Sequence, residues 1–175
     1  QYHNIYYNHL RGHAFPPIET INILKNNYEK VYLLTNIQEL KDLEYVKESY
    51  DKLEFKDVKL ILFNSTPSPN WKSIFVCLIQ NKDCYIQKNK DINKRNLNKQ
   101  LSLMNEYQKN NSDIFIFKSL DYLCNKNNEC PVYKKSDDIL FYRDNSHLTY
   151  NGAISLLNNF ETFIKESKFI REVLF

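Results

Sequence analysis

The sequence predicts an α/β domain built on a mostly parallel β-sheet. Two observations support this prediction: short, continuous apolar runs recur along the chain, and longer amphipathic segments separate them. Strands that are buried on both faces of a parallel sheet have continuous runs of Val, Ile, Leu and Phe, whereas covering helices repeat apolar residues every three or four positions. Because strands alternate with helices, we expect right-handed crossovers and a ligand site beyond the carboxyl ends of the strands.

The elements follow one another in the order that this fold class requires. The second predicted helix shows the pattern most clearly, with Leu40, Leu43 and Val46 at helical spacing. The predicted helices cover residues 18–28, 37–53, 93–110 and 149 to about 165, and the predicted strands are KVYLLT (30–35), VKLILF (58–63) and DIFIF (113–117). The Pro- and Ser-rich stretch 64–71 directly follows the second of these strands, so we expect a loop at the ligand edge.

Length, charge and hydrophobicity limit the possible classes of protein. The 175 residues fit a single domain spanning 1–175. No run of about 18 apolar residues occurs, and the first residues do not resemble a signal peptide. The sequence does not begin with Met, so we expect a piece of a longer protein. The net charge is only +3, and basic and acidic residues are interspersed, which disfavours a nucleic-acid partner.

Four cysteines form two pairs that are close in sequence, Cys77 with Cys84 and Cys124 with Cys130. The spacings differ from those of zinc ribbons and fingers, and no His is nearby, so we favour two local disulfides over a zinc site. Four reduced thiols in a cytosolic protein are the other alternative. Disulfides would indicate an extracytoplasmic compartment.

The stretch FYRDNSHLTYNGA (141–153) is the strongest candidate for a functional site. Asp144 and His147 lie three residues apart, just before a predicted helix that Thr149 can cap. A hydroxyl nucleophile needs a general base, usually His, and that His needs a carboxylate to fix its tautomer. Gly152 and Ala153 are small, so the helix can approach the sheet closely. The alternative is a solvated loop with an incidental Asp and His.

This stretch resembles the last sequence block of SGNH-type hydrolases and acyltransferases, in which a hydrophobic strand precedes D-x-x-H-L-[ST]. It is most similar to the SGNH domain that follows the membrane acyltransferase family 3 domain in bacterial O-acetyltransferases. Three further segments are similar to segments of that family in the same order: GHAFPPI, VKLILFNSTPSPNWKSIFVCL and LDYLCNKNNECPVY. The resemblance implies a three-layer, flavodoxin-like SGNH fold with a mostly parallel sheet that lacks its first strand here.

The resemblance also implies a serine nucleophile in a Gly-Asp-Ser-His motif, and this sequence contains no such motif. Ser65, after the second predicted strand, and Ser146, inside the Asp-x-x-His turn, are weak substitutes. The family's oxyanion donors correspond to Gly12 and Asn36. The alternatives are an ordinary turn at Gly12 and, for Asn36, an N-cap of a helix that begins at Ile37.

Three functions remain open on the sequence. The first is O-acyl transfer, for example of an acetyl group, to a cell-envelope carbohydrate through an acyl-serine, with Asp144 and His147 as the acid–base pair. The others are an SGNH esterase or deacetylase and a non-catalytic, degenerate SGNH module. The expected partners are an acyl donor, a carbohydrate acceptor and a fused membrane acyltransferase domain. We expect no metal, cofactor or nucleic acid, and a membrane-tethered location at the periplasm or cell surface.

Overall fold

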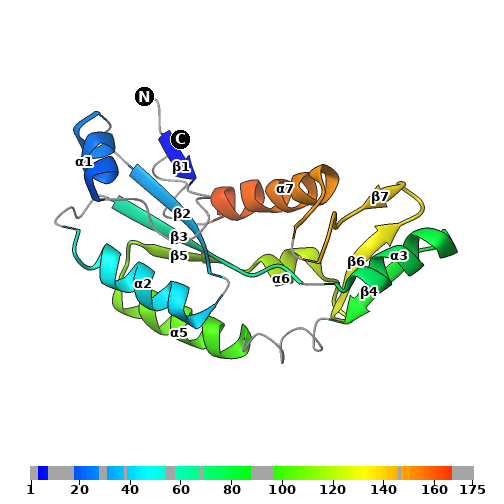
Figure 1. Ribbon diagram of the computed structural model, residues 1–175. Coiled ribbons are helices and arrows are strands. Elements are labelled where there is room, and N and C mark those ends of the chain that lie inside the picture. Colours follow the sequence, from blue (N-terminus) through cyan, green and yellow to red (C-terminus); the bar gives the residue numbers. More distant parts are fainter. Residues whose placement is uncertain are drawn as a thin grey trace. The chain divides into compact units, whose positions relative to one another are not determined.

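The computed structural model describes residues 4–7, 18–27, 31–37, 39–53, 58–67, 69–87, 97–145 and 147–166. The chain divides into two compact units (Figure 1). The first unit comprises residues 1–65 and 96–117, and the second comprises 66–95 and 118–175. We describe each unit by itself, and the single domain expected over 1–175 stays a prediction.

The first unit is built on a parallel sheet with the strand order β1-β2-β3-β5. Its strands are β1 (Asn4–Tyr7), β2 (Val31–Ile37), β3 (Val58–Asn64) and β5 (Ile114–Phe117). In the register, Leu33 lies beside Leu60 and Leu60 beside Ile114. Tyr32 and Ile61, which point to the opposite face, are also buried. Burial on both faces explains why β2, β3 and β5 are continuous apolar runs.

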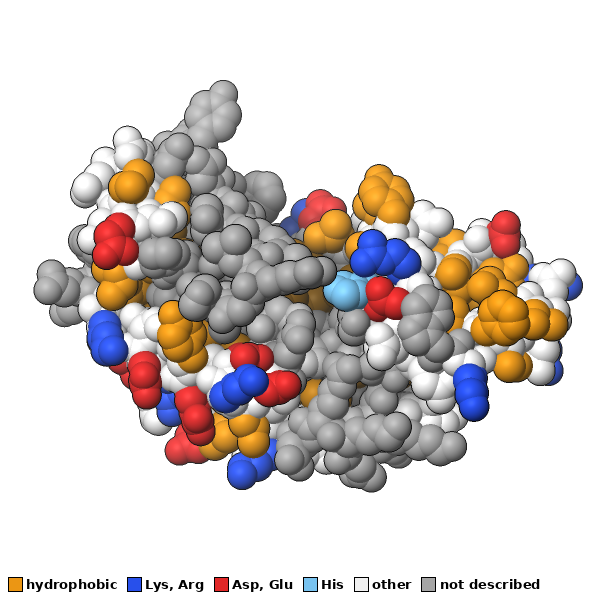
Figure 2. Space-filling model, viewed as in Figure 1, with side chains coloured by type: hydrophobic (Ala, Val, Ile, Leu, Met, Phe, Trp, Pro, Cys, Tyr) orange, Lys and Arg blue, Asp and Glu red, His pale blue; other side chains and the backbone are white. Residues whose placement is uncertain are grey.

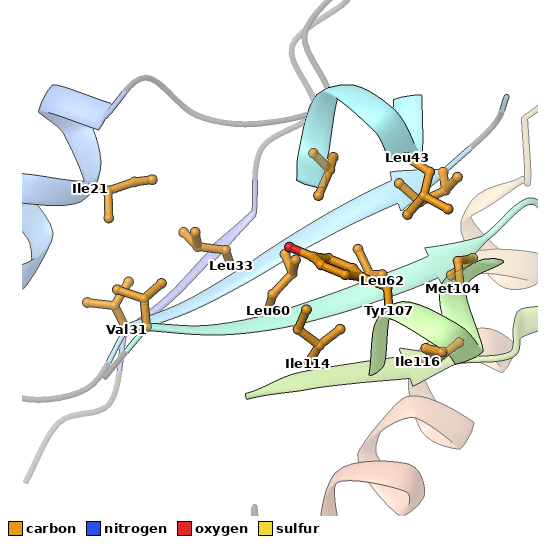
Figure 3. Packing of buried hydrophobic residues seen from close by; sticks show 13 residues of the cluster. Ile21, Val31, Leu33, Leu43, Leu60, Leu62, Met104, Tyr107, Ile114 and Ile116 are labelled. Atoms are coloured by element: carbon orange, nitrogen blue, oxygen red, sulfur yellow. The ribbon is translucent and has the colours of Figure 1, made fainter. Parts of the chain in front are cut away.

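One face of this sheet is covered by α1 (Ile18–Asn27), α2 (Leu40–Tyr50) and α5 (Leu97–Asn110). Figure 3 shows side chains of the three helices meeting alternate residues of the strands in one cluster. The helices contribute Ile21, Leu43, Val46, Met104 and Tyr107, and the strands contribute Val31, Leu33, Ile37, Val58, Leu60, Leu62, Ile114 and Ile116. Burial of these apolar side chains is the main term that stabilises the unit.

Tyrosine hydroxyl groups form hydrogen bonds near the C-terminal ends of α2 and α5. Tyr107 donates a hydrogen bond to the Asp51 carboxylate at 2.8 Å, and Tyr50 donates to the carbonyl oxygen of Val58 at 2.5 Å. Burial is the main reason why the pKa of both phenols is raised, and the neighbouring Asp51 raises both further. Both therefore stay neutral donors at physiological pH.

The second unit carries a small antiparallel sheet of order β4-β6-β7. The strands are β4 (Cys84–Gln87), β6 (Glu129–Lys134) and β7 (Ile139–Leu140), and the helices are α3 (Trp71–Gln80), α6 (Ser119–Leu123) and α7 (Tyr150–Glu166). Its core contains Ile74, Cys77, Val132, Tyr133, Phe141 and Tyr142. The sequence did not predict this sheet, α3 or α6.

Two disulfides hold the small sheet to its neighbours. Cys77 of α3 is bonded to Cys84 at the start of β4, and Cys124, which ends α6, is bonded to Cys130 in β6. The predicted pairing is therefore present, and the zinc and reduced-thiol alternatives were wrong. Each bond restrains a short loop in the unfolded chain.

Removing the bond between Cys124 and Cys130 should destabilise the second unit. We expect the Cys124→Ala/Cys130→Ala variant to lose about 2 kcal/mol of unfolding free energy, because a loop of this length loses that much entropy when it is closed. Urea unfolding without reductant measures the loss. Wild-type protein in dithiothreitol is the control and should lose the contributions of both disulfides. An unchanged urea midpoint in the variant would contradict the prediction.

The fold class is confirmed as α/β with a parallel sheet, consistent with an SGNH or flavodoxin-like fold. Each predicted strand and helix is present with shifted ends. One shift has a clear cause: α2 begins at Leu40 and not at Ile37, because β2 continues to Ile37. A capping box between Glu39 and Asp42 starts the helix, and the Glu39 amide donates to the Asp42 carboxylate at 2.8 Å.

Candidate active site

Asp144 and His147 contact each other directly. The Nδ1 atom of His147 lies 2.9 Å from Oδ1 and 2.8 Å from Oδ2 of Asp144. The backbone amide of His147 also donates to Asp144 Oδ1 at 2.8 Å. An aspartate that accepts a backbone N–H a few residues ahead forms a tight local turn. Asp144 therefore shapes the loop and holds the imidazole at the same time.

The loop that carries this pair is closed by its own backbone. The Arg143 amide donates to the His147 carbonyl oxygen at 2.9 Å, and Tyr142 and Leu148 form an antiparallel bridge. Tyr142 is a core residue and is only 1 % exposed. This closure was not predicted from the sequence. Its only signal there is that apolar residues flank the polar segment on each side.

Thr149 joins the loop to α7. Its hydroxyl donates to the Leu140 carbonyl oxygen and accepts a hydrogen bond from the Gly152 amide at 3.1 Å, which is the geometry of an N-cap. Its own amide donates to the Phe141 carbonyl oxygen at 2.9 Å. The predicted helix cap is therefore confirmed, and it also anchors the helix start to the segment after β7.

Gly152 allows α7 to lie directly against this segment. A Cβ atom at Gly152 would be 2.3 Å from the Phe141 carbonyl oxygen and 3.0 Å from its carbonyl carbon. The Phe141 amide in turn donates to Val132 of β6 at 2.9 Å. A continuous chain of contacts therefore runs from β6 through Phe141 to the base of the Asp–His loop.

The imidazole is accessible, whereas the carboxylate is mostly buried. The side chain of His147 is 49 % exposed and that of Asp144 is 20 % exposed. Figure 2 shows histidine surface (pale blue) next to acidic surface (red). Arg143 Nε lies 3.6 Å from Asp144 Oδ2, an exposed ion pair that adds positive charge beside the carboxylate. The arrangement suits a ring that exchanges protons with a bound molecule.

This geometry suits general acid–base chemistry. A carboxylate at Nδ1 favours the tautomer in which Nδ1 carries the proton, so that Nε2 is the basic atom. It also stabilises the imidazolium that forms when Nε2 takes a proton from a hydroxyl. The predicted contact between Asp144 and His147 is present, and its catalytic role stays a prediction.

Ser65 is fixed in the core of the first unit. It follows β3, is 2 % exposed, and donates its hydroxyl proton to the Ile37 carbonyl oxygen of β2 at 2.9 Å. An activated nucleophile would instead donate this proton to a base. The hydroxyl ties together the carboxyl ends of two strands, which is a structural role. Ser146 lies outside the described residues.

Replacing Ser65 by alanine should affect stability and not chemistry. We expect a loss of about 1 kcal/mol in unfolding free energy, the usual contribution of a buried hydrogen bond. Labelling of the full-length protein by a serine-directed fluorophosphonate should stay at the wild-type level. Thermal unfolding and gel fluorescence measure the two effects, and loss of labelling in a folded variant would make Ser65 the nucleophile.

Of the two residues predicted to bind the oxyanion, the structure describes only Asn36. Gly12 lies outside the described residues. Asn36 is the penultimate residue of β2, so it is not an N-cap, and that alternative was wrong. Its side-chain oxygen is buried and has no hydrogen-bond partner among the described residues. The residue as a whole is only partly buried, and an oxyanion would be bound by the amide nitrogen and not by this oxygen. The role of Asn36 as an oxyanion donor therefore stays a prediction.

The described residues contain no group of three or more His, Cys, Asp or Glu side chains that is arranged to bind a metal ion. In the same part of the chain, no helix combines the length and the apolar character that crossing a membrane requires.

A His–Asp pair on a closed loop before α7 is an arrangement that the acid–base chemistry of hydrolases and acyltransferases uses. The family model for the SGNH domain that is fused to AT3 domains matches residues 9–162. The chain therefore belongs to this SGNH domain family. Comparisons with curated proteins and with solved structures give no match.

Proposed function

We propose that the protein transfers an acyl group, such as acetyl, to a hydroxyl of a cell-envelope carbohydrate through an acyl-serine intermediate. His147 takes the serine proton and gives it to the leaving group of the acyl donor. It then takes the proton of the acceptor hydroxyl and returns it to the serine oxygen as the acyl group moves to the acceptor, while Asp144 holds the ring and stabilises its charged form. The observation that carries the proposal is the double contact of the Asp144 carboxylate with His147 Nδ1.

The family supports the transferase form of this reaction. The matching model describes SGNH domains that are fused to AT3 domains, which links the chain to a membrane acyltransferase. A fused acyltransferase domain is a source of acyl groups for the serine. The two disulfides are compatible with an extracytoplasmic location, where envelope carbohydrates are found.

We propose that the nucleophilic serine and its oxyanion-binding amide belong to sequence outside these 175 residues. The sequence has no Gly-Asp-Ser motif, and the hydroxyl of Ser65 is committed to a strand carbonyl. Gly12 and Asn36 are the proposed additional donors to the oxyanion, since such donors stabilise the tetrahedral intermediate.

Covalent labelling of the full-length protein tests this function. A fluorophosphonate should label the wild-type protein at one serine, and His147→Gln should slow labelling by about 10²–10⁴-fold, the usual effect of a general base. Tyr150→Ser is a matched control, because Tyr150 is an exposed residue next to the same loop. An unlabelled wild-type protein, or an unaffected His147→Gln variant, would contradict the acyl-serine mechanism.

The acceptor distinguishes the transferase from the second candidate, an esterase or deacetylase. The same His–Asp pair would then activate water in place of a carbohydrate hydroxyl. Release of free acetate from an acetylated glycan, without transfer to an added acceptor, would favour the esterase. A degenerate, non-catalytic module would give neither product and no labelling.

A further inference from the structure

The helix α3 exposes a row of large apolar side chains. Phe75 is 65 % exposed and Ile79 is 68 % exposed, and Val76 and Leu78 of the same helix are also exposed. The opposite side of α3 is apolar too, because Ile74 and Cys77 pack into the core of the second unit. A surface helix normally has one polar face, so a helix that is apolar on both sides indicates a binding surface.

These four residues, Phe75, Val76, Leu78 and Ile79, are called the α3 face here. Figure 2 shows hydrophobic side chains gathered over the region where Figure 1 draws α3 and the small sheet.

The charge around the α3 face is positive. Lys72 in the first turn of the helix and Lys82 just beyond its end are exposed, and α3 itself carries no carboxylate. Asp83 follows directly and offsets one of these two charges, and its carboxylate accepts a hydrogen bond from the Lys135 amide at 2.9 Å. Apolar side chains flanked by lysines match the acyl chains and anionic head groups of a lipid surface.

The α3 face is held in place before any partner binds. The disulfide between Cys77 and Cys84 ties the helix to β4, and β4 pairs with β6. A surface that is ordered in advance loses little conformational entropy when it binds. This distinguishes α3 from peptides that fold only on contact with lipid.

We propose that the α3 face docks onto the surface of a bilayer, with Phe75 and Ile79 entering the boundary between head groups and acyl chains. The family match supports a lipid surface over a second protein as the occupant, because a domain fused to an AT3 membrane domain works next to a bilayer. Docking through α3 would restrict how the unit that carries Asp144 and His147 moves above that bilayer. This inference does not depend on the catalytic proposal.

Flotation with lipid vesicles tests the proposal. We would mix the 175-residue chain with vesicles of equimolar phosphatidylglycerol and phosphatidylcholine. Binding should carry the protein upward with the vesicles in a density gradient. Vesicles of phosphatidylcholine alone should bind about fivefold less for each lysine that contacts the surface.

Two double variants test whether the vesicles bind through the α3 face. Phe75→Ser/Ile79→Ser should lower the partition coefficient at least about tenfold, because two apolar side chains no longer leave water. The matched control is Ile23→Ser/Leu157→Ser, which removes two exposed apolar side chains from α1 and α7 and should bind as the wild type does. Circular dichroism confirms that both variants are folded.

Three outcomes would overturn the proposal. One is a wild-type chain that does not float with either vesicle. Another is an equal loss of binding in the two double variants. The third is a dimer in sedimentation without lipid that the Phe75→Ser/Ile79→Ser substitutions dissociate, since the α3 face would then join two copies of this chain.

Discussion

Replacing Gly152 by alanine should lower the free energy of unfolding of the second unit by about 3 kcal/mol, the upper range for overpacking a buried site. The new Cβ would lie 2.3 Å from the Phe141 carbonyl oxygen, which is a backbone atom and cannot rotate away. That oxygen already accepts the Thr149 amide at 2.9 Å. The methyl group would therefore push α7 away from its own N-terminal anchor.

Whether Gly152→Ala lowers or raises the stability shows which effect is larger, the clash with Phe141 or the gain in helix propensity. Alanine is the better helix former by about 1 kcal/mol, so an uncrowded glycine would give a more stable variant. Asn151→Ala is the matched control, because Asn151 is exposed on the same turn and gains propensity without a clash. Urea unfolding measures both variants, and a Gly152→Ala protein as stable as the wild type would show that Phe141 and α7 do not touch closely.

Most elements of the first unit were predictable because burial on two faces leaves a strong pattern, whereas the four-residue strand β1 was not predicted. The runs around Leu33, Leu60 and Ile114 occupy adjacent positions in the sheet, and they were recognised as strands from composition alone. Their ends were less certain. β2 continues to Ile37 because a buried residue remains in register with Asn64, and no local signal marks that limit.

The second unit was less predictable because its strands are short and irregular. β6 contains Pro131, a residue that usually argues against a strand, and β4 has only four residues. Their pairing is set by contacts distant in sequence and by the disulfides at Cys84 and Cys130. The helix α3 was missed for a different reason, since a short, nearly continuous apolar run such as IFVCLI does not distinguish a helix from a buried strand.

The sequence identified the pair at the candidate site but not the structure that holds it. The Asp144–His147 spacing was sufficient, because a turn of three residues brings the two side chains together. Closure of the loop by Tyr142 and Leu148, and the ion pair of Arg143, depend on backbone geometry that spacing does not reveal. The resemblance pointed to Thr149 and Gly152, and the contacts at Phe141 give the physical reason for both.

Asp144→Asn should abolish most of the proposed acyl transfer by the full-length protein while leaving its stability nearly intact. Asparagine keeps a side-chain oxygen that can accept the His147 amide, which is 2.8 Å from Asp144 Oδ1 in the wild type, so the turn is retained. It replaces the other carboxylate oxygen, 2.8 Å from Nδ1, with a neutral group that does not stabilise an imidazolium. We expect kcat to fall by about 10²–10⁴-fold, the usual range for lost acid–base catalysis.

The comparison with Asp144→Ala separates the two roles of this residue. Alanine removes both the acceptor for the His147 amide and the charge, so it should lower activity as much as asparagine does and also cost about 1 kcal/mol of unfolding free energy. Transfer kinetics and urea unfolding measured on both variants give the two effects independently. If Asp144→Asn keeps kcat within about threefold of the wild type, the carboxylate only shapes the loop. The 2.8 Å contact with Nδ1 would then be structural, and His147 would act without a charged partner.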